Sequence, residues 1–164
     1  MQGATKHMQN KPRIFHFYSI RISSPISISS AKFEIKKMTD KQLTSIIIGL
    51  AMEVHSSLGP GLLEKVYQEC LFYKLKKEGL KVRKEVAVPL YFDDIHLECG
   101  FRIDLLVEDR IILEIKSVSA LHDIHLAQTL TYLKLTKRTT GLILNFNTLL
   151  MKNGIKRVVN GYGA

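Results

Sequence analysis

The sequence lacks the features that mark several protein classes. It has only two cysteines, Cys70 and Cys99, and no CxxC spacing, which argues against a disulfide framework and against a thiolate zinc site. It also has no stretch that approaches the roughly 18 consecutive apolar residues of a membrane-spanning helix. We therefore expect a soluble protein of the reducing cytoplasm, with no membrane partner.

Acidic residues are few relative to basic ones. The 164 residues include 24 Lys or Arg and 15 Asp or Glu, which gives a formal net charge of +9. Residues 1–38 contain seven of these bases and a single acid, Glu34, so this segment alone has a net charge of +6 and the rest of the chain only +3. Bulk charge is therefore weak support for a nucleic-acid partner of the folded part.

The composition is sufficient for one folded domain. Hydrophobic residues make up 46% of the chain, enough for the core of a single domain of ordinary size. Residues 1–38 show neither helical nor strand periodicity, and we expect a poorly ordered basic N-terminal extension, or a segment upstream of a true start at Met38. The apolar run in it is broken by His16, which argues against a secretory signal. We expect the domain to span residues 39–164.

The spacing of apolar residues predicts that this domain mixes helices and strands. Apolar residues at helical spacing indicate helices over residues 40–58, 62–78 and 121–136. Strand-like runs are found over residues 82–92, 95–107, 111–115, 141–146 and 155–159. The first of these strands is expected to bend or end near Pro89, and Asp93 and Asp94 are expected to form a turn.

The segment FRIDLLVEDRIILEI, residues 101–115, predicts a β-hairpin with one apolar side. If residues 108–110 form the loop, Val107 pairs with Ile111 and every later pair follows from that register. One side of the hairpin is then wholly apolar and should face the core. This side comprises Phe101, Ile103, Leu105, Val107, Ile111, Leu113 and Ile115.

The other side of the same hairpin gathers charged residues at the end remote from the turn. In this register Asp104 lies opposite Glu114, and Arg102 lies opposite Lys116. Opposed carboxylates repel one another, and a hard divalent cation such as Mg²⁺, with Mn²⁺ as a substitute, would compensate them. Lys116 could orient or deprotonate an attacking water, or neutralise charge on a phosphate.

These parts are the ones that hydrolysis of a phosphodiester bond requires, since a metal polarises the phosphoryl oxygen and lowers the pKa of its bound water. The alternative is a solvated ion-pair cluster on a sheet surface. The strands are apolar at nearly every other position, as in strands buried on both faces, where an isolated charge is costly. We therefore favour the catalytic interpretation.

A second motif, GLLEKVY at residues 61–67, precedes the hairpin. With it, the chain from about residue 38 to 161 resembles the small bacterial and archaeal GxxExxY proteins of the PD-(D/E)XK nuclease superfamily. The resemblance includes GFRIDLLVEDRIILEIKSV, the HLAQTLTYLKL helix and the LILNF strand. Ile103 stands where the proline that names the superfamily is usually found, a position that varies widely among its members.

The resemblance implies an α/β restriction-endonuclease-like core, a mixed central β-sheet flanked by α-helices with the active hairpin in its middle. It further implies a metal-dependent nuclease that acts on nucleic acid, on DNA in preference to RNA. Asp104 and Glu114 would bind Mg²⁺, and Lys116 would be the catalytic lysine.

Further site residues are predicted on two helices. Glu64 and Tyr67 lie one helical turn apart. Glu64 is expected to belong to the catalytic set as a third metal ligand, direct or through water, although an exposed acid favoured by the helix dipole explains it equally well. Tyr67 is expected to shape the site or to belong to the core.

On the later helix, His125, Gln128 and Tyr132 share one face. Gln128 and Tyr132 match a QxxxY pattern of RecB-type exonucleases, in which it helps to shape the site and to contact nucleic acid. His125 could bind a phosphate or have a structural role.

Two alternatives to a nuclease stay open at this point. One is a catalytically silent, nuclease-like module that binds nucleic acid or a protein, and the other is an accessory component of a larger complex. The complete Asp, Glu and Lys set favours catalysis, because a silent site has no chemical need for all three. The sequence leaves the oligomeric state and the cleavage specificity open.

Overall fold

The computed structural model describes residues 35, 37–97 and 100–161. Most of the predicted N-terminal extension, residues 1–34 and 36, lies outside the described residues. Just ahead of helix α2, Ile35 packs against the core, and Arg110 Nη1 donates a hydrogen bond to the carbonyl oxygen of Met38.

The elements in chain order are α2 (Asp40–Leu58), α3 (Glu64–Lys77), β1 (Val82–Ala87), β2 (Leu90–Phe92), β3 (Ile95–Leu97), β4 (Arg102–Val107), β5 (Ile111–Lys116), α4 (Asp123–Leu135), β6 (Thr140–Asn145), the 3₁₀ helix η1 (Met151–Gly154) and β7 (Ile155–Val159).

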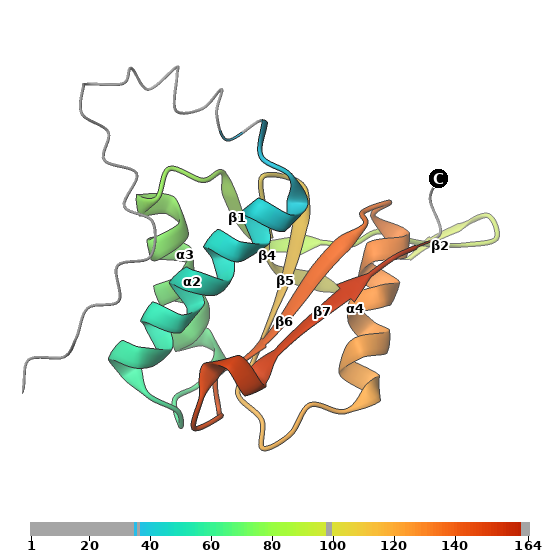
Figure 1. The fold of residues 1–164 in the computed structure, drawn as a ribbon. Helices are drawn as coiled ribbons and strands as arrows, with labels where there is room; N and C mark the ends of the chain where they lie inside the picture. Colours follow the sequence, from blue (N-terminus) through green and yellow to red (C-terminus); the bar gives the residue numbers. More distant parts are fainter. Residues whose placement is uncertain (1–34, 36, 98–99, 162–164) are drawn as a thin grey trace, which may run out of the picture.

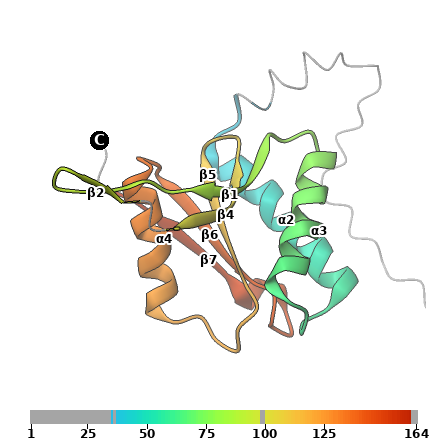
Figure 2. The same ribbon diagram turned by 180° about the vertical axis from the view of Figure 1, so that it is seen from behind.

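A five-stranded sheet in the order β1-β4-β5-β6-β7 forms the centre of the molecule. The β5–β6 pair is parallel and the other pairs are antiparallel. Helices α2 and α3 cover one face of the sheet and α4 covers the other (Figures 1 and 2). This arrangement confirms the predicted class, a mixed central sheet flanked by helices.

Each face of the sheet has its own hydrophobic core. The larger core lies between the sheet and α2 and α3, and the smaller one lies between the sheet and α4. Strands β4, β5 and β6 contribute to both, since successive strand residues point to opposite faces. No helix in the described part of the chain has both the length and the apolar character needed to cross a membrane.

The first described helix, α2, has the bounds that the sequence predicts. A capping box opens it, in which Thr39 and Gln42 bond reciprocally through side chain and backbone, and this satisfies backbone donors that the first turn leaves free. It ends at Gly59, whose φ of +70° is a left-handed conformation that glycine adopts without steric cost. The other two helices are one to two residues shorter at each end than predicted.

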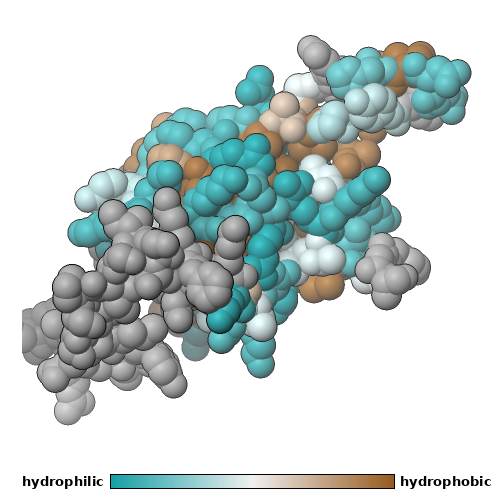
Figure 3. Space-filling model, turned by 90° about the horizontal axis from the view of Figure 1, so that it is seen from above, coloured by the Kyte–Doolittle hydropathy of each residue, from teal (hydrophilic) through white to brown (hydrophobic). Residues whose placement is uncertain are grey.

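The prediction of one continuous strand over residues 95–107 is wrong. Residues 95–97 form β3, which pairs with β2 in a separate two-stranded sheet, whereas β4 belongs to the central sheet. The alternating pattern runs across both strands, so it does not mark the break between them. The β2–β3 arm projects from the body (Figures 1 and 2) and carries hydrophobic side chains on its surface (Figure 3), with Tyr91 68% and Ile95 57% exposed.

The predicted register of the β4–β5 hairpin is confirmed near its turn. Val107 pairs with Ile111, and the ladder continues through two further pairs to Leu105 and Leu113. There the pairing of β4 with β5 ends. The two residues at the loop tip, Glu108 and Asp109, have φ angles of +52° and +54°, the backbone twist that matches a tight hairpin.

The faces of β4 switch at Asp104. Leu105 and Val107 pack in the core beneath α2 and α3, whereas Ile103 packs in the core beneath α4. In regular strands, residues two apart share a face, so the predicted single apolar side that includes Ile103 is wrong. Phe101 likewise lies on the α4 side, with its ring 6.2 Å from that of Tyr132.

Candidate active site

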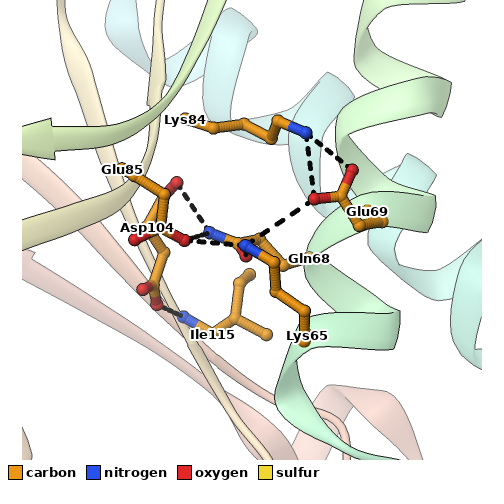
Figure 4. A network of polar contacts seen from close by, with 7 residues as sticks. All are labelled: Lys65, Gln68, Glu69, Lys84, Glu85, Asp104 and Ile115. Carbon is orange, nitrogen blue, oxygen red and sulfur yellow. Dashed lines mark hydrogen bonds and ion pairs between the residues drawn. The ribbon is translucent and has the colours of Figure 1, made fainter.

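Asp104 lies where β4 separates from β5. Its Oδ2 accepts a hydrogen bond of 2.7 Å from the backbone amide of Ile115. If the β4–β5 ladder continued, a backbone carbonyl of β4 would accept the bond from this amide. Its own carbonyl oxygen accepts a bond of 3.0 Å from Nε2 of Gln68 on α3. Both the carboxylate and the backbone of Asp104 are therefore held by named partners (Figure 4).

Because the ladder ends before Asp104, two predicted cross-strand pairs are wrong. Arg102 pairs with Ala87 of β1 and not with Lys116, and Glu114 pairs with Ile143 of β6 and not with Asp104. The physical reason is the bond from the Ile115 amide to the Asp104 carboxylate, which replaces the next rung of the hairpin.

Glu114 is the most deeply buried acid of the site. It is 2% exposed, and within the described residues its Oε1 has no hydrogen-bond partner. Its Oε2 lies 3.5 Å from Nζ of Lys116, whose side chain is 15% exposed. Strand alternation places both side chains on the face that α4 covers, since Ile112 on the same face packs in that core. A buried carboxylate with one free oxygen is costly unless a further partner binds it.

Asp104, Glu114 and Lys116 change one another's electrostatic environment, as the pKa shifts of the two acids indicate. Burial, and then the neighbouring Asp104, raise the pKa of Glu114 to about 8, against the lowering effect of Lys116. Burial also raises the pKa of Asp104, while its bond from Ile115 and the charge of Lys116 oppose that change. The fold thus brings the charges of Asp104, Glu114 and Lys116 within range of each other, although the first two are not a cross-strand pair.

A cavity of about 680 Å³ opens beside Asp104, and its lining residues come from the start of α3, from β1, β4 and β5, and from the loops that follow β5 and β6. Glu64 and Asp104 line it, together with Gln68 and Glu85, whereas Glu114 and Lys116 are not among its lining residues. The charges of Glu85 and Glu64 both raise the pKa of Asp104. Three carboxylates, those of Glu64, Glu85 and Asp104, therefore line the cavity.

Glu64 joins α3 to the end of β5. Its Oε1 accepts a hydrogen bond of 3.0 Å from the backbone amide of Ser117, the residue that follows Lys116. The hydroxyl of Ser117 in turn donates to the carbonyl oxygen of Leu62 at 2.6 Å. Glu64 is exposed and is one of the residues that line the cavity.

Tyr67 holds the loop between α2 and α3 from within the core. Its side chain is fully buried and stacks on Phe146 with the ring centroids 4.5 Å apart. The hydroxyl donates to the carbonyl oxygen of Gly59 at 2.7 Å and accepts from the amide of Leu62 at 3.1 Å. The motif at residues 61–67 thus ties this loop to the core through Tyr67 and to β5 through Glu64.

The three predicted site residues of α4 lie in two places: Gln128 and Tyr132 bond to each other, and His125 lies at the helix start. Tyr132 is 3% exposed and accepts a hydrogen bond of 2.9 Å from Nε2 of Gln128. Burial raises the pKa of Tyr132, and the charge of Glu114 adds to that effect. His125 lies at the helix start, where its Nδ1 accepts from the amide of His122 at 3.0 Å in a capping box.

The residues present fit a hard divalent cation. In the described ranges, no three His, Cys, Asp or Glu side chains are arranged to hold a metal ion together. Mg²⁺, however, is commonly bound through one or two carboxylates and keeps several waters. Such an ion would bind the buried oxygen of Glu114 that has no hydrogen-bond partner, and it would offset the repulsion between Glu114 and Asp104.

Three polar residues of this region were not predicted from the sequence. Gln68 and Glu85 line the cavity beside Asp104. Asn145, 1% exposed, holds the segment after Lys116, because its Oδ1 accepts from the amide of Val118 and its Nδ2 donates to the carbonyl oxygen of the same residue. A polar residue that ends the otherwise apolar run of β6 was the available signal for Asn145.

Comparison with known proteins gives one match. A family model described as the PD-(D/E)XK nuclease superfamily matches residues 41–158, which include both helices of the larger core and all five strands of the central sheet up to Val158. No curated protein and no solved structure matches the chain.

Proposed function

We propose that this chain, which belongs to the PD-(D/E)XK nuclease superfamily, is a metal-dependent nuclease that hydrolyses phosphodiester bonds of nucleic acid, with DNA preferred to RNA. The observation that carries the proposal is the buried Glu114, which has a free Oε1 and an electrostatic neighbour in Asp104. A domain selected only for stability would place an apolar residue there, because a buried polar oxygen without a hydrogen-bond partner costs free energy. We also assign the chain to the GxxExxY group, on the motif at residues 61–67.

In this proposal Asp104 and Glu114 hold Mg²⁺ or Mn²⁺, with Glu64 as a third ligand through its second oxygen. The bound ion supplies charge neutralisation on the phosphoryl oxygen and a water of lowered pKa. Lys116 is the catalytic lysine. Its Nζ is anchored 3.5 Å from Glu114, which leaves its other two N–H donors to orient the attacking water or to stabilise the developing charge on the phosphate.

Three further residues shape the site. Tyr132 presents a buried hydroxyl that accepts a hydrogen bond from Gln128, and its own O–H is assigned to the substrate. Tyr67 holds the loop that carries Glu64. His125 caps α4 through Nδ1, and its Nε2 is assigned to a substrate phosphate. The cavity beside Asp104 provides the volume that a nucleotide needs.

The test is cleavage by the purified full-length chain. Single-stranded, duplex and branched DNA and RNA are incubated with Mg²⁺ or Mn²⁺, and we expect cleavage that EDTA abolishes. Lys116→Ala and Asp104→Asn are expected to lower the rate at least ~100-fold while the circular dichroism spectrum is retained. Lys77→Ala and Asp93→Asn, which change exposed residues outside the site, serve as matched controls. If no substrate is cut under any of these conditions, the nuclease proposal fails.

A catalytically silent nucleic-acid-binding module is the second candidate, favoured by one observation. Glu114 and Lys116 already contact each other, with Nζ of the lysine 3.5 Å from Oε2 of the acid. Calorimetric titration with Mg²⁺ separates the two functions. The nuclease takes up Mg²⁺ and loses this binding in Asp104→Asn, whereas a silent module binds DNA with an affinity that neither Mg²⁺ nor Asp104→Asn changes.

A further inference from the structure

The β1–β4 ladder has a gap opposite Asp104. Lys84 pairs with Leu105, and Val86 pairs with Ile103, but the rung between them is not formed. The residue opposite Asp104 at this rung is Glu85, which has a φ of +51°. A non-glycine residue in this left-handed region is strained, and such strain persists only where the surroundings enforce it.

Both strands exchange their faces at this gap. On β1, Val82 packs in the core beneath α2 and α3, whereas Val86 packs against the core beneath α4. On β4, the same exchange occurs between Leu105 and Ile103. The gap therefore directs the Asp104 carboxylate toward the Ile115 amide and the cavity.

The side chain of Gln68 fills the gap. It is 3% exposed, and its Nε2 donates to the carbonyl oxygen of Asp104 at 3.0 Å and to Oε1 of Glu85 at 2.8 Å. One amide group of α3 thus bonds to both residues of the missing rung (Figure 4). The carbonyl of Asp104, which has lost its strand partner, is satisfied by this bond, as a buried carbonyl must be.

Lys65 fixes the amide of Gln68 in this orientation. Its Nζ donates to Oε1 of Gln68 at 2.8 Å and to Oε1 of Glu85 at 2.9 Å. With Oε1 of Gln68 occupied by a donor, its Nε2 must face Asp104 and Glu85. The three side chains form a closed network in which each one contacts the other two.

We infer that Gln68 is a positioning residue, which acts with Glu85 and Lys65 to hold the strand gap open and so aims the Asp104 carboxylate into the site. This inference rests on the proposed function, in which Asp104 binds the metal. An apolar side chain of the same size would fill the volume but leave the Asp104 carbonyl and the Glu85 carboxylate without this donor. Removing such a second-layer contact typically lowers metal affinity 10–100-fold.

The informative variant is Gln68→Met, which keeps the length of the side chain and removes the amide. Its matched control is Glu69→Gln, because Glu69 belongs to the same network through Lys84 and Lys65 but does not contact Asp104. If Gln68→Met does not fold, Glu85→Gln replaces it. Glu85→Gln keeps an oxygen for Gln68 and removes the charge that binds Lys65, so a smaller change in the same direction is expected.

Two measurements are made on each variant. The first is hydrogen exchange of the Ile115 amide in metal-free protein, which reports directly on the bond to Asp104, with the Leu113 amide of the intact ladder as an internal reference. The second is Mn²⁺ affinity by calorimetry. For Gln68→Met we expect the Ile115 amide to exchange at least ~10-fold faster relative to Leu113 and Mn²⁺ to bind ~10-fold more weakly. For Glu69→Gln both values should stay within about twofold, as for a surface change.

The outcomes distinguish this inference from the proposed function. If wild type binds Mn²⁺ and cleaves, but Gln68→Met leaves either Ile115 exchange or Mn²⁺ affinity unchanged, the positioning role is overturned and the nuclease proposal stands. If wild type neither binds Mn²⁺ nor cleaves, while Gln68→Met still accelerates exchange at Ile115, the nuclease proposal fails and the aiming of Asp104 by Gln68 is supported.

Discussion

Nζ of Lys116 lies 3.5 Å from Oε2 of Glu114, at the outer limit of a hydrogen bond. The other carboxylate oxygen of Glu114 is buried and has no partner in the part of the chain that the structure describes. The lysine therefore compensates the buried charge only in part. The result is a site whose charge balance is incomplete in the metal-free protein, and this imbalance can be measured as a dependence of stability on pH.

Glu114→Gln is expected to stabilise the metal-free protein at alkaline pH. The pKa of Glu114 is about 8 in the folded state, against 4.5 as its ordinary value. Below pH 4.5 the carboxyl is protonated in both states and carries no penalty. Between pH 4.5 and 8 the carboxyl ionises in the unfolded state first, so wild type loses stability relative to Glu114→Gln. Above pH 8 the difference is constant at roughly 5 kcal/mol.

Urea unfolding in EDTA at pH 5 and pH 8.5 measures this difference. Glu78→Gln, which changes an exposed acid, serves as the control and should show no such dependence. A stability difference between wild type and Glu114→Gln that is equal at the two pH values would contradict the prediction.

Glu64→Gln tests whether Glu64 contributes charge or only structure. The amide oxygen of glutamine can still accept the bond from Ser117, so the free energy of unfolding should change by less than ~0.5 kcal/mol. If the second carboxylate oxygen binds the metal, Mn²⁺ affinity measured by calorimetry should fall about tenfold. If the Mn²⁺ affinity does not change, Glu64 is not a metal ligand, and its role is only to connect α3 with the end of β5.

Tyr67→Phe should destabilise the fold and loosen the loop that carries Glu64. The hydroxyl serves Gly59 and Leu62, and the loss of a buried partner costs about 1–3 kcal/mol. Urea unfolding measures the stability, and hydrogen exchange across residues 59–63 measures the loop. Tyr73→Phe, at a side chain 64% exposed, is the matched control, and an equal effect of both variants would refute a specific role for Tyr67.

Two glycines should respond to alanine in opposite directions. A Cβ at Gly154 would lie 2.1 Å from the carbonyl oxygen of Asn145, so the backbone must shift, and we expect a loss of at least about 3 kcal/mol. A Cβ at Gly49, on the exposed side of α2, meets nothing within 4 Å, and alanine should add about 1 kcal/mol through helix propensity. Thermal unfolding of both variants checks the signs.

Local patterns were sufficient to predict most of the fold. The periodicity and the capping residues of α2 act within one helix, so its bounds are predicted from neighbours in the sequence. The hairpin turn at residues 108–110 likewise fixes the register for three pairs, as far as Leu105 and Leu113. The parallel β5–β6 pair and the α4 crossover follow from the order of strand, helix and strand.

The detail of the site could not be predicted because it depends on contacts between distant segments. The strand ladder stops at Asp104 because its own carboxylate bonds to Ile115 and because Gln68, 36 residues earlier, bonds to its carbonyl. Neither contact leaves a periodic signal. The same holds for Glu85, whose left-handed backbone is imposed by its surroundings. Alternation alone therefore placed Asp104 opposite Glu114.

The early end of the β4–β5 ladder affects the order in which the site can form during synthesis. Beyond Leu113, the backbone of β5 pairs with β6 and not with β4. Glu114 and Lys116 therefore acquire a strand neighbour only when residues 140–145 have left the ribosome and α4 has folded back across the sheet. A nascent chain that ends within α4 already contains the proposed site acids and Lys116. Its β5, however, has not yet paired with β6, the strand that aligns Glu114 and Lys116.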